Sequence, residues 1–274
     1  MLNDGFVTVD KIMYDDSDIV RIARVTTAKS KKKFNSDEKL LTYLYKEGHS
    51  SPFNFPEIIL LVRAPLFVRE QWFRHRTGTR EEIFVDNGWY VDVESTDQQA
   101  SQYSDQQQFS GRYAQYDGKF YLPPEDWFLE PSATNHQASS NKKLANASSL
   151  REAMLAQQTG QFSNYNDLID AGLARERARI NLPLATYSEW FWKQDLWNTL
   201  DWLKKRRHPS AQLEIVAYAK IIEKIVEEYF PLTYKAWLNV VDGVQLTRDE
   251  LLELREAITG CKLNEPLARK LGVG

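Results

Sequence analysis

The stretch from residue 55 to residue 76 limits what this chain can fold into more than any other part of the sequence. It reads FPEIILLVRAPLFVREQWFRHR and is the most apolar run in the chain. Residues 56–64 suit a buried strand, and residues 65–75 predict a helix with Pro65 near its first turn. No stretch of the sequence reaches the roughly 18 apolar residues that a membrane helix needs. The run therefore predicts the core of a globular domain.

Residues 74–76, Arg-His-Arg, end this run directly behind a tryptophan and a phenylalanine. Charge at the end of a buried element is costly unless it is paired. The cations either complement the dipole of a helix C-terminus or bind an anion, because paired arginines match phosphate geometry. Two further basic groups lie in helical sequence, at 204–208 and at 175–183, where Arg175 and Arg179 share one helical face. Three such groups in an acidic protein favour a specific phosphate ligand.

Helical patterns dominate the rest of the chain. Strands are predicted over residues 6–14 and from Pro183 to residue 195. The sequence is strand-like over residues 109–123 and typical of a polar loop over residues 130–149. We expect helices over 17–28 (begun by Ser17 or Asp18), 36–49 (capped by Ser36 and ended by Gly48), 150–172, 173–183, 196–207, 210–241 and 246–258. With four to six strands, this pattern indicates an α+β fold with a helical C-terminal half.

The composition and the absence of common motifs exclude several classes of function. The 274 residues carry a formal net charge of −3, which argues against a protein that coats nucleic acid. Cys261 is the only cysteine, so neither a disulfide framework nor a thiolate metal cluster is expected, and a reducing cytoplasm is the expected location. The N-terminus lacks the pattern of a signal peptide. The sequence contains no HExxH, GxGxxG, P-loop or GxSxG motif, so no metal site and no Rossmann cofactor site is predicted.

Five blocks of sequence follow one another between about Ile22 and Leu238. They read GHSSPFNF, APLFVREQWFRHRTGT, FSGRY, RARINLPLATYSEWFWKQDL and LKKRRHPSAQLEI. In this order they resemble the successive motifs of the flavin-dependent thymidylate synthases of the ThyX type. The Arg-His-Arg group behind QWF resembles the signature of that family.

The resemblance implies a curved, mainly antiparallel sheet with helices, assembled as a homotetramer with active sites between subunits. It implies that FAD is the cofactor, that dUMP becomes dTMP, and that methylenetetrahydrofolate and NADPH are co-substrates. No nucleic-acid or membrane partner is expected. Residues 1–242 would form one catalytic domain with a probable insertion at 83–108, and residues 243–274 a helical C-terminal extension.

The resemblance also assigns site residues by position. The residues that match dUMP-binding positions are Gln71, Arg74, Gln108, Ser110, Gly111, Arg112, Arg179 and Arg206. Arg206 also matches the catalytic arginine that helps the uracil ring to ionise. The residues that match FAD-binding positions are His49, Ser51, Arg74, His75, Arg76, Glu82, Gln108, Asp195, Leu196, Trp197, Asp201 and Ser210.

The chain departs from the family pattern at two places. A segment rich in Gln, Ser and Asp separates Arg76 from Ser110 and splits the signature, so that either Glu82 or Gln108 fills its carboxylate position. Ser210 stands where the family has a histidine. Two alternatives therefore stay open: a relative that methylates or hydroxymethylates another pyrimidine nucleotide such as UMP, and a non-catalytic nucleotide- or RNA-binding relative.

Overall fold

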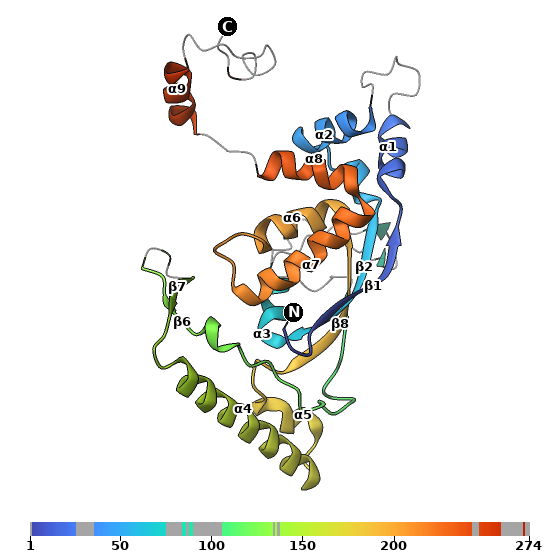
Figure 1. Ribbon diagram of the computed structural model, residues 1–274. Helices are drawn as coiled ribbons and strands as arrows, with labels where there is room; N and C mark the ends of the chain where they lie inside the picture. Colours follow the sequence, from blue (N-terminus) through green and yellow to red (C-terminus); the bar gives the residue numbers. More distant parts are fainter. Residues whose placement is uncertain are drawn as a thin grey trace.

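The computed structural model describes residues 2–25, 36–74, 84–85, 88–89, 106–133, 135, 138–242, 247–258 and 271. A four-stranded antiparallel sheet forms the centre of the described chain (Figure 1), and its strands lie in the order β1 (Phe6–Met13), β2 (Glu57–Pro65), β8 (Tyr187–Asp195) and β5 (Gln106–Gln108). Two short hairpins are separate from it, β3 (Phe84–Val85) with β4 (Gly88–Trp89) and β6 (Leu129–Pro131) with β7 (Ser139–Lys143).

Strand β2 lies in the middle of the sheet because its side chains can be buried. Ile58, Leu60 and Val62 are fully buried on one face, in the alternation that a strand imposes. Leu60 pairs with Trp192 of β8 and Val62 with Trp190, so aliphatic and indole side chains face the same core.

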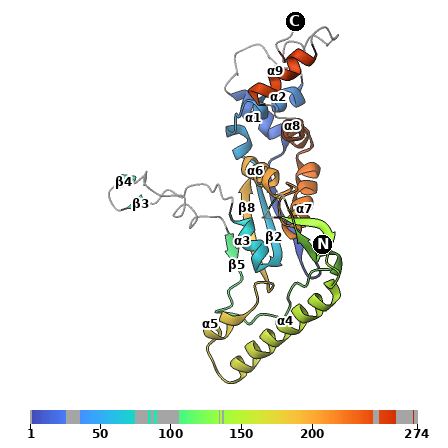
Figure 2. The same ribbon diagram turned by 90° about the vertical axis from the view of Figure 1, so that its left-hand side faces the viewer.

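Helices surround the sheet in three groups (Figures 1 and 2). Against the centre pack α3 (Leu66–Trp72), α6 (Leu196–Arg206) and α7 (Leu213–Tyr229). At one end lie α1 (Asp16–Val25), α2 (Asp37–Lys46), α8 (Pro231–Val241) and α9 (Arg248–Ala257). At the opposite end lie α4 (Ala147–Asp170) and α5 (Arg175–Ala178). In the described residues, the short 3₁₀ turns are η1 (Ser51–Asn54), η3 (Glu125–Trp127) and η4 (Arg179–Asn181).

Trp72 ties the central helices to the sheet. Its ring lies 4.7 Å from that of Trp202 in α6, and 5.5 and 5.3 Å from those of Trp190 and Trp192 in β8. Aromatic pairs at such separations add to the stability that burial alone provides. The indole N–H of Trp202 also donates to the Trp72 carbonyl at 3.0 Å, which satisfies one of the free carbonyls at the end of α3.

Most of the expected elements are confirmed: the α+β class, the strand over residues 6–14, the strand over 56–64 (β2), the strand after Pro183 (β8), and the helices at 150–172, 196–207 and 246–258. Ser36 accepts the Lys39 N–H and caps α2 as predicted, and Gly48 follows the helix with a φ of +72°. Thr247 and Glu250 form a capping box at the start of α9. In the part of the chain that is described, no helix is long and apolar enough to cross a membrane.

Two predicted helices have different bounds. The start at Ser17 or Asp18 is wrong, because Asp15 accepts the N–H groups of Ser17 and Asp18 and α1 begins at Asp16. The single helix over 210–241 is wrong as well. Pro231 has no N–H to continue the α7 ladder, and it opens α8 instead. The buried Asp16 carboxylate accepts the next two N–H groups of α8 at 2.7 and 3.1 Å.

Other expectations fail where tertiary contacts decide. Residues 109–123 form turns with a single bridge from Phe120 to Thr186, and the expected polar loop at 130–149 contains strands of the β6–β7 hairpin. Pro65 is the N-cap residue of α3, next to the first turn as expected, and it also ends β2. Helix α5 ends at Ala178, so Arg175 and Arg179 do not share one helix. The described residues hold eight strand segments instead of four to six.

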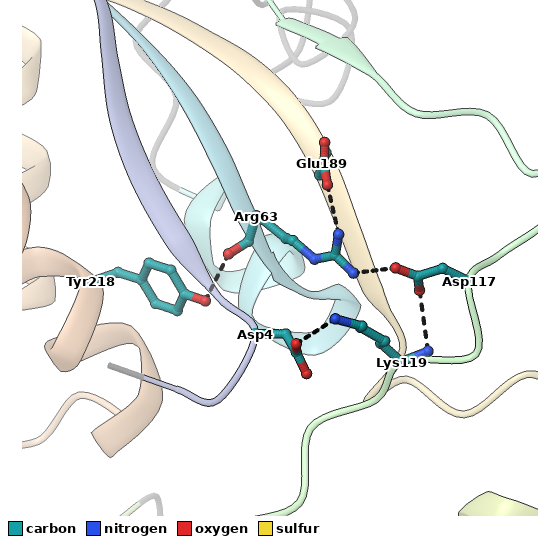
Figure 3. A network of polar contacts seen from close by, with 6 residues as sticks. All are labelled: Asp4, Arg63, Asp117, Lys119, Glu189 and Tyr218. Carbon is teal, nitrogen blue, oxygen red and sulfur yellow. Dashed lines mark hydrogen bonds and ion pairs between the residues drawn. The ribbon is translucent and has the colours of Figure 1, made fainter.

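A charged network joins the segment after Ser110 to the sheet (Figure 3). The Arg63 guanidinium donates to Glu189 at 2.8 Å and to Asp117 at 2.5 Å. Two more contacts extend the network: Lys119 donates to Asp4 at 2.6 Å, and the Tyr218 hydroxyl donates to the Arg63 carbonyl at 2.8 Å. The segment from 109 to 121 is therefore fixed to β2 and β8 by charge as well as by the bridge at Phe120.

Candidate functional site

The C-terminal end of α3 gathers the first group of predicted site residues. The Gln71 carbonyl oxygen accepts the Arg74 N–H at 3.3 Å and also a hydrogen bond from the Arg206 guanidinium of α6. The Gln71 side chain donates to that of Gln212, which precedes α7. Gln71, Arg74 and Arg206, far apart in sequence, are thus brought together by the ends of two helices and the start of a third.

Arg206 is half-buried and lies close to a second cation. Burial and then the positive charge of Arg74 hold the pKa of Arg206 below its ordinary value. Among the residues the structure describes, no carboxylate forms an ion pair with Arg206, and its Nε is buried without a hydrogen-bond partner. Two neighbouring cations at a helix end favour the binding of an anion.

A cavity of about 770 Å³ lies beside Arg206, lined by Lys204, Lys205, Arg206, Arg207, His208, Pro209, Ser210, Ala211, Val241 and Asp242. Two other cations of its lining have partners. Lys205 pairs with Asp201 at 2.5 Å, and Arg207 pairs with Asp242 at 3.1 Å. The Ser210 hydroxyl lies 2.6 Å from the His208 ring. Ser210 and Arg206 therefore share one recess, whereas Asp201 already has a cationic partner.

The second group is the Ser110–Arg112 segment, which follows β5. Ser110 accepts the N–H groups of Tyr113 and Ala114 on its carbonyl, at 3.0 and 3.1 Å, so the chain turns sharply here. Gly111 is buried, and the side chain of Arg179 lies directly against it. The structure thus brings Ser110, Gly111 and Arg179 together, as the resemblance implies.

Arg112 and Gln108 lie on either side of this turn. Arg112 is exposed, and its Nε lies 3.6 Å from a Glu176 carboxylate oxygen. Gln108 is half-buried in β5 and donates to the Ser188 hydroxyl of β8 at 3.0 Å. Its side chain amide is thus held by the sheet, and Arg112 is open to solvent.

The third group surrounds the start of α6, at the opposite end of that helix from Arg206. Asp195 caps α6 by accepting the Asn198 N–H at 2.8 Å, and burial raises the pKa of Asp195 despite this hydrogen bond. Trp197 is half-buried and lies 5.0 Å from the Tyr45 ring. Leu196 is fully buried and its N–H donates to the Pro56 carbonyl at 2.9 Å, so its side chain belongs to the core.

His49 and Ser51 lie near this group. The His49 ring is 5.9 Å from that of Tyr43, and Ser51 is an exposed residue of η1. The Phe53 ring of the same turn lies 5.9 Å from Trp197, which places η1 beside the start of α6. Exposed polar side chains next to aromatic rings suit a flavin nucleotide.

Three predicted flavin residues, His75, Arg76 and Glu82, lie outside the described residues. The choice between Glu82 and Gln108 for the carboxylate position therefore stays a prediction. In the same described part, no three His, Cys, Asp or Glu side chains gather in a way that could hold a metal ion.

The structure adds residues that the sequence did not indicate. Gln212 holds Gln71, and Tyr116 packs on Gly111 beside Arg179. Gln212 lies in the block LKKRRHPSAQLEI but was assigned no site role, and Tyr116 lies outside the five blocks. Only the tertiary contact marks them.

The fold and these residues define a class, an α+β protein whose clustered arginines suit an anionic nucleotide. Comparison with known proteins specifies it further. A family model, Thy1, described as thymidylate synthase complementing protein, matches residues 9–232. The chain belongs to this family.

Curated relatives agree over almost the whole chain. A flavin-dependent thymidylate synthase of Thermus thermophilus is 36% identical over 279 residues, covering 100% of this chain and 90% of that protein. The flavin-dependent thymidylate synthase of Wolbachia pipientis wMel is 33% identical over 262 residues, covering 95% of this chain and 83% of that protein.

A solved structure agrees in fold. The UMP/dUMP methylase PolB from Streptomyces cacaoi bound with 5-Br UMP superposes with a TM-score of 0.70, at 24% identity, covering 86% of this chain and 95% of that one. At this identity the likeness shows the fold alone, and it confirms the ThyX-like architecture.

Proposed function

We propose that this protein is a flavin-dependent thymidylate synthase that converts dUMP to dTMP, with methylenetetrahydrofolate and NADPH as co-substrates. The observation that carries the proposal is the Arg206 guanidinium, half-buried beside Arg74 with no carboxylate partner in the described chain, in a protein matched by the Thy1 model. A pyrimidine that gains negative charge during the reaction needs such a cation close by.

The residues present fit FAD. Ser51, His49 and the half-buried Trp197 form a polar and aromatic surface near the start of α6, and Arg74 at the end of α3 offers a cation for a pyrophosphate. FAD would supply the redox chemistry when bound. Asp195 would remain the cap of α6 and keep this surface rigid.

The arginines would bind the nucleotide phosphate and stabilise the charge on the pyrimidine. Arg74, Arg112 and Arg179 would hold the nucleotide phosphate, since guanidinium groups bind phosphate bidentately. Gln71 would orient the site through its bond to Gln212. Arg206 would face the pyrimidine and stabilise the charge that develops on the ring.

Assembly is part of the proposal. Arg206 and Asp195 lie at opposite ends of α6, about 16 Å apart along the helix axis. One chain therefore separates residues that the resemblance assigns to one site, and a homotetramer with sites shared between subunits would complete each site. A cytoplasmic location fits the single cysteine of the sequence.

The decisive experiment is tritium release from C5-labelled dUMP, with and without methylenetetrahydrofolate and NADPH, on protein whose flavin absorbance is recorded. We expect FAD-containing protein and release that requires both co-substrates. A colourless protein that takes up no FAD would contradict the proposal. Labelled UMP in a parallel reaction decides between the two nucleotides.

A matched variant tests the absence of a cysteine nucleophile. Cys261→Ser replaces the only cysteine of the chain, at a position beyond the residues matched by the family model. We expect its turnover to stay within about twofold of the unmodified protein. Turnover lost without unfolding would show that this mechanism is wrong.

A further inference from the structure

Tyr116 explains why position 111 is a glycine. A Cβ added at Gly111 would lie 2.4 Å from Cε2 of Tyr116 and 3.2 Å from Cδ of Arg179. Gly111 does not have a positive φ, so the backbone conformation does not require glycine there. The requirement is space, because the Tyr116 ring and the Arg179 side chain both pack directly on this backbone.

The Tyr116 ring has little freedom to move. It makes edge contacts with Phe109 at 5.1 Å and with Tyr165 at 6.4 Å, and its own N–H donates to the Tyr165 hydroxyl at 3.3 Å. The next residue, Asp117, is held to the sheet by Arg63 (Figure 3). The phenol is therefore presented to Arg179 by a segment that is fixed on both sides.

The Tyr116 phenol stays neutral although a guanidinium, that of Arg179, lies next to it. Burial raises the pKa of Tyr116, although the nearby Arg179 guanidinium and the charge of Arg69 oppose this rise. The phenol is thus neutral at pH 7. Arg179 forms no ion pair with any carboxylate in the described chain, whereas Arg112 lies 3.6 Å from Glu176.

We propose that Tyr116 is a positioning residue that holds the Arg179 guanidinium over Gly111 while leaving its charge available to a nucleotide phosphate. A neutral acceptor can orient a guanidinium without cancelling its charge, which a carboxylate would do. Asp117, one residue later, makes the opposite kind of contact and neutralises Arg63. This inference rests on the proposed nucleotide function, and Tyr116 acts through Arg179 instead of touching the reacting atoms.

The test is Tyr116→Phe, which removes the hydroxyl and keeps the ring. We expect the KM for dUMP and the Kd for dUMP alone to rise by about 3- to 10-fold, with kcat within twofold and the FAD content unchanged. Tyr218→Phe is the matched control, because it removes a hydroxyl that donates to the Arg63 carbonyl at 2.8 Å. Its KM for dUMP should not change.

A double-mutant cycle separates positioning from a structural role. In an Arg179→Ala background, Tyr116→Phe should have no further effect on dUMP binding. Gly111→Ala provides a second route, since the added methyl group displaces the ring and should also raise the Kd for dUMP. An unchanged Kd in Tyr116→Phe, or an equal loss in both backgrounds, would overturn the inference. If the unmodified protein neither binds nor turns over dUMP, the proposed function fails instead.

Discussion

Arg63 and Arg206 are both partly buried arginines, but carboxylates bind only the first of them in the described chain. Arg63 lies in β2 with a side chain 16% exposed, and Asp117 and Glu189 both bind its guanidinium. Arg206 ends α6 beside another arginine, and it donates to a backbone carbonyl instead of a carboxylate.

The pKa values express this difference. Burial lowers the pKa of Arg63, but hydrogen bonds and charges from Asp117 and Glu189 outweigh burial and raise it overall. Burial also lowers the pKa of Arg206, and Arg74 lowers it further. Arg63 is thus compensated within the fold, whereas the charge of Arg206 has no carboxylate partner in the described chain, which makes Arg206 a candidate ligand-binding residue.

The largest effect that this comparison predicts is on catalysis. Arg206→Ala should lower kcat by about 10- to 150-fold, because a charge-assisted contact contributes roughly 1.5–3 kcal/mol. The free energy of unfolding should change by no more than about 1 kcal/mol, since only one backbone contact is lost. Steady-state kinetics and chemical denaturation measure these two quantities, and flavin absorbance checks that the FAD content persists. Unchanged kinetics would move the role to Arg207 or remove it.

Arg63→Ala should show the reverse pattern. It leaves Asp117 and Glu189 without their cation, and we expect the free energy of unfolding to fall by about 2 kcal/mol. Arg21→Ala is the control, because its pair with Asp18 is exposed and screened by solvent, so its removal should cause a much smaller loss than Arg63→Ala. Equal losses in the two variants, measured by urea denaturation, would break the comparison.

The sequence predicted elements whose signals are local. The apolar run of β2, the Ser36 cap of α2 and the amphipathic pattern of α9 all depend on residues close together in the chain, so they could be read directly, although the capping box of α9 was not predicted. The break at Pro231 has a local cause too, but the apolar pattern continues across it and hid the boundary. The turns after Ser110 could not be predicted, because their shape depends on contacts with Arg63 and Arg179.

In the candidate site, too, some features could be predicted from the sequence and others depend on tertiary contacts. The resemblance indicated Arg74, Arg179 and Arg206, and the structure places each beside other residues of its group. The sequence placed Arg206 in a basic group and at a family position, and Arg63 in an apolar run, but it did not show which of the two arginines has carboxylate partners. The structure shows the difference. Two carboxylates bind Arg63, which makes it structural, whereas no carboxylate of the described chain binds Arg206, the candidate catalytic arginine.

The smallest predicted effect concerns Asp117, and it tests whether charge compensation accounts for the Arg63 network. Burial raises the pKa of Asp117, but the hydrogen bonds and charges of Arg63 and Lys119 outweigh burial, so the pKa is lowered overall from 3.8. A carboxyl group with a lowered pKa in the folded state stabilises the protein above its unfolded pKa, and this contribution is lost as the pH falls through the folded value.

Asp117→Asn should therefore cost about 0.5–1 kcal/mol at pH 7, a modest amount because the Asp117 side chain is 46% exposed and screened by solvent. The difference between the variant and the unmodified protein should shrink as the pH falls below about 4, where the unfolded carboxyl group begins to take up a proton, and it should disappear below the lowered pKa of the folded carboxyl group. Asp126→Asn, at a residue 85% exposed beside Lys143, is the control and should show almost no difference at either pH. If Asp117→Asn costs the same at pH 7 and at a pH of about 3.5, hydrogen-bond geometry and not charge holds the segment, and Arg63 would no longer be the compensated counterpart of Arg206.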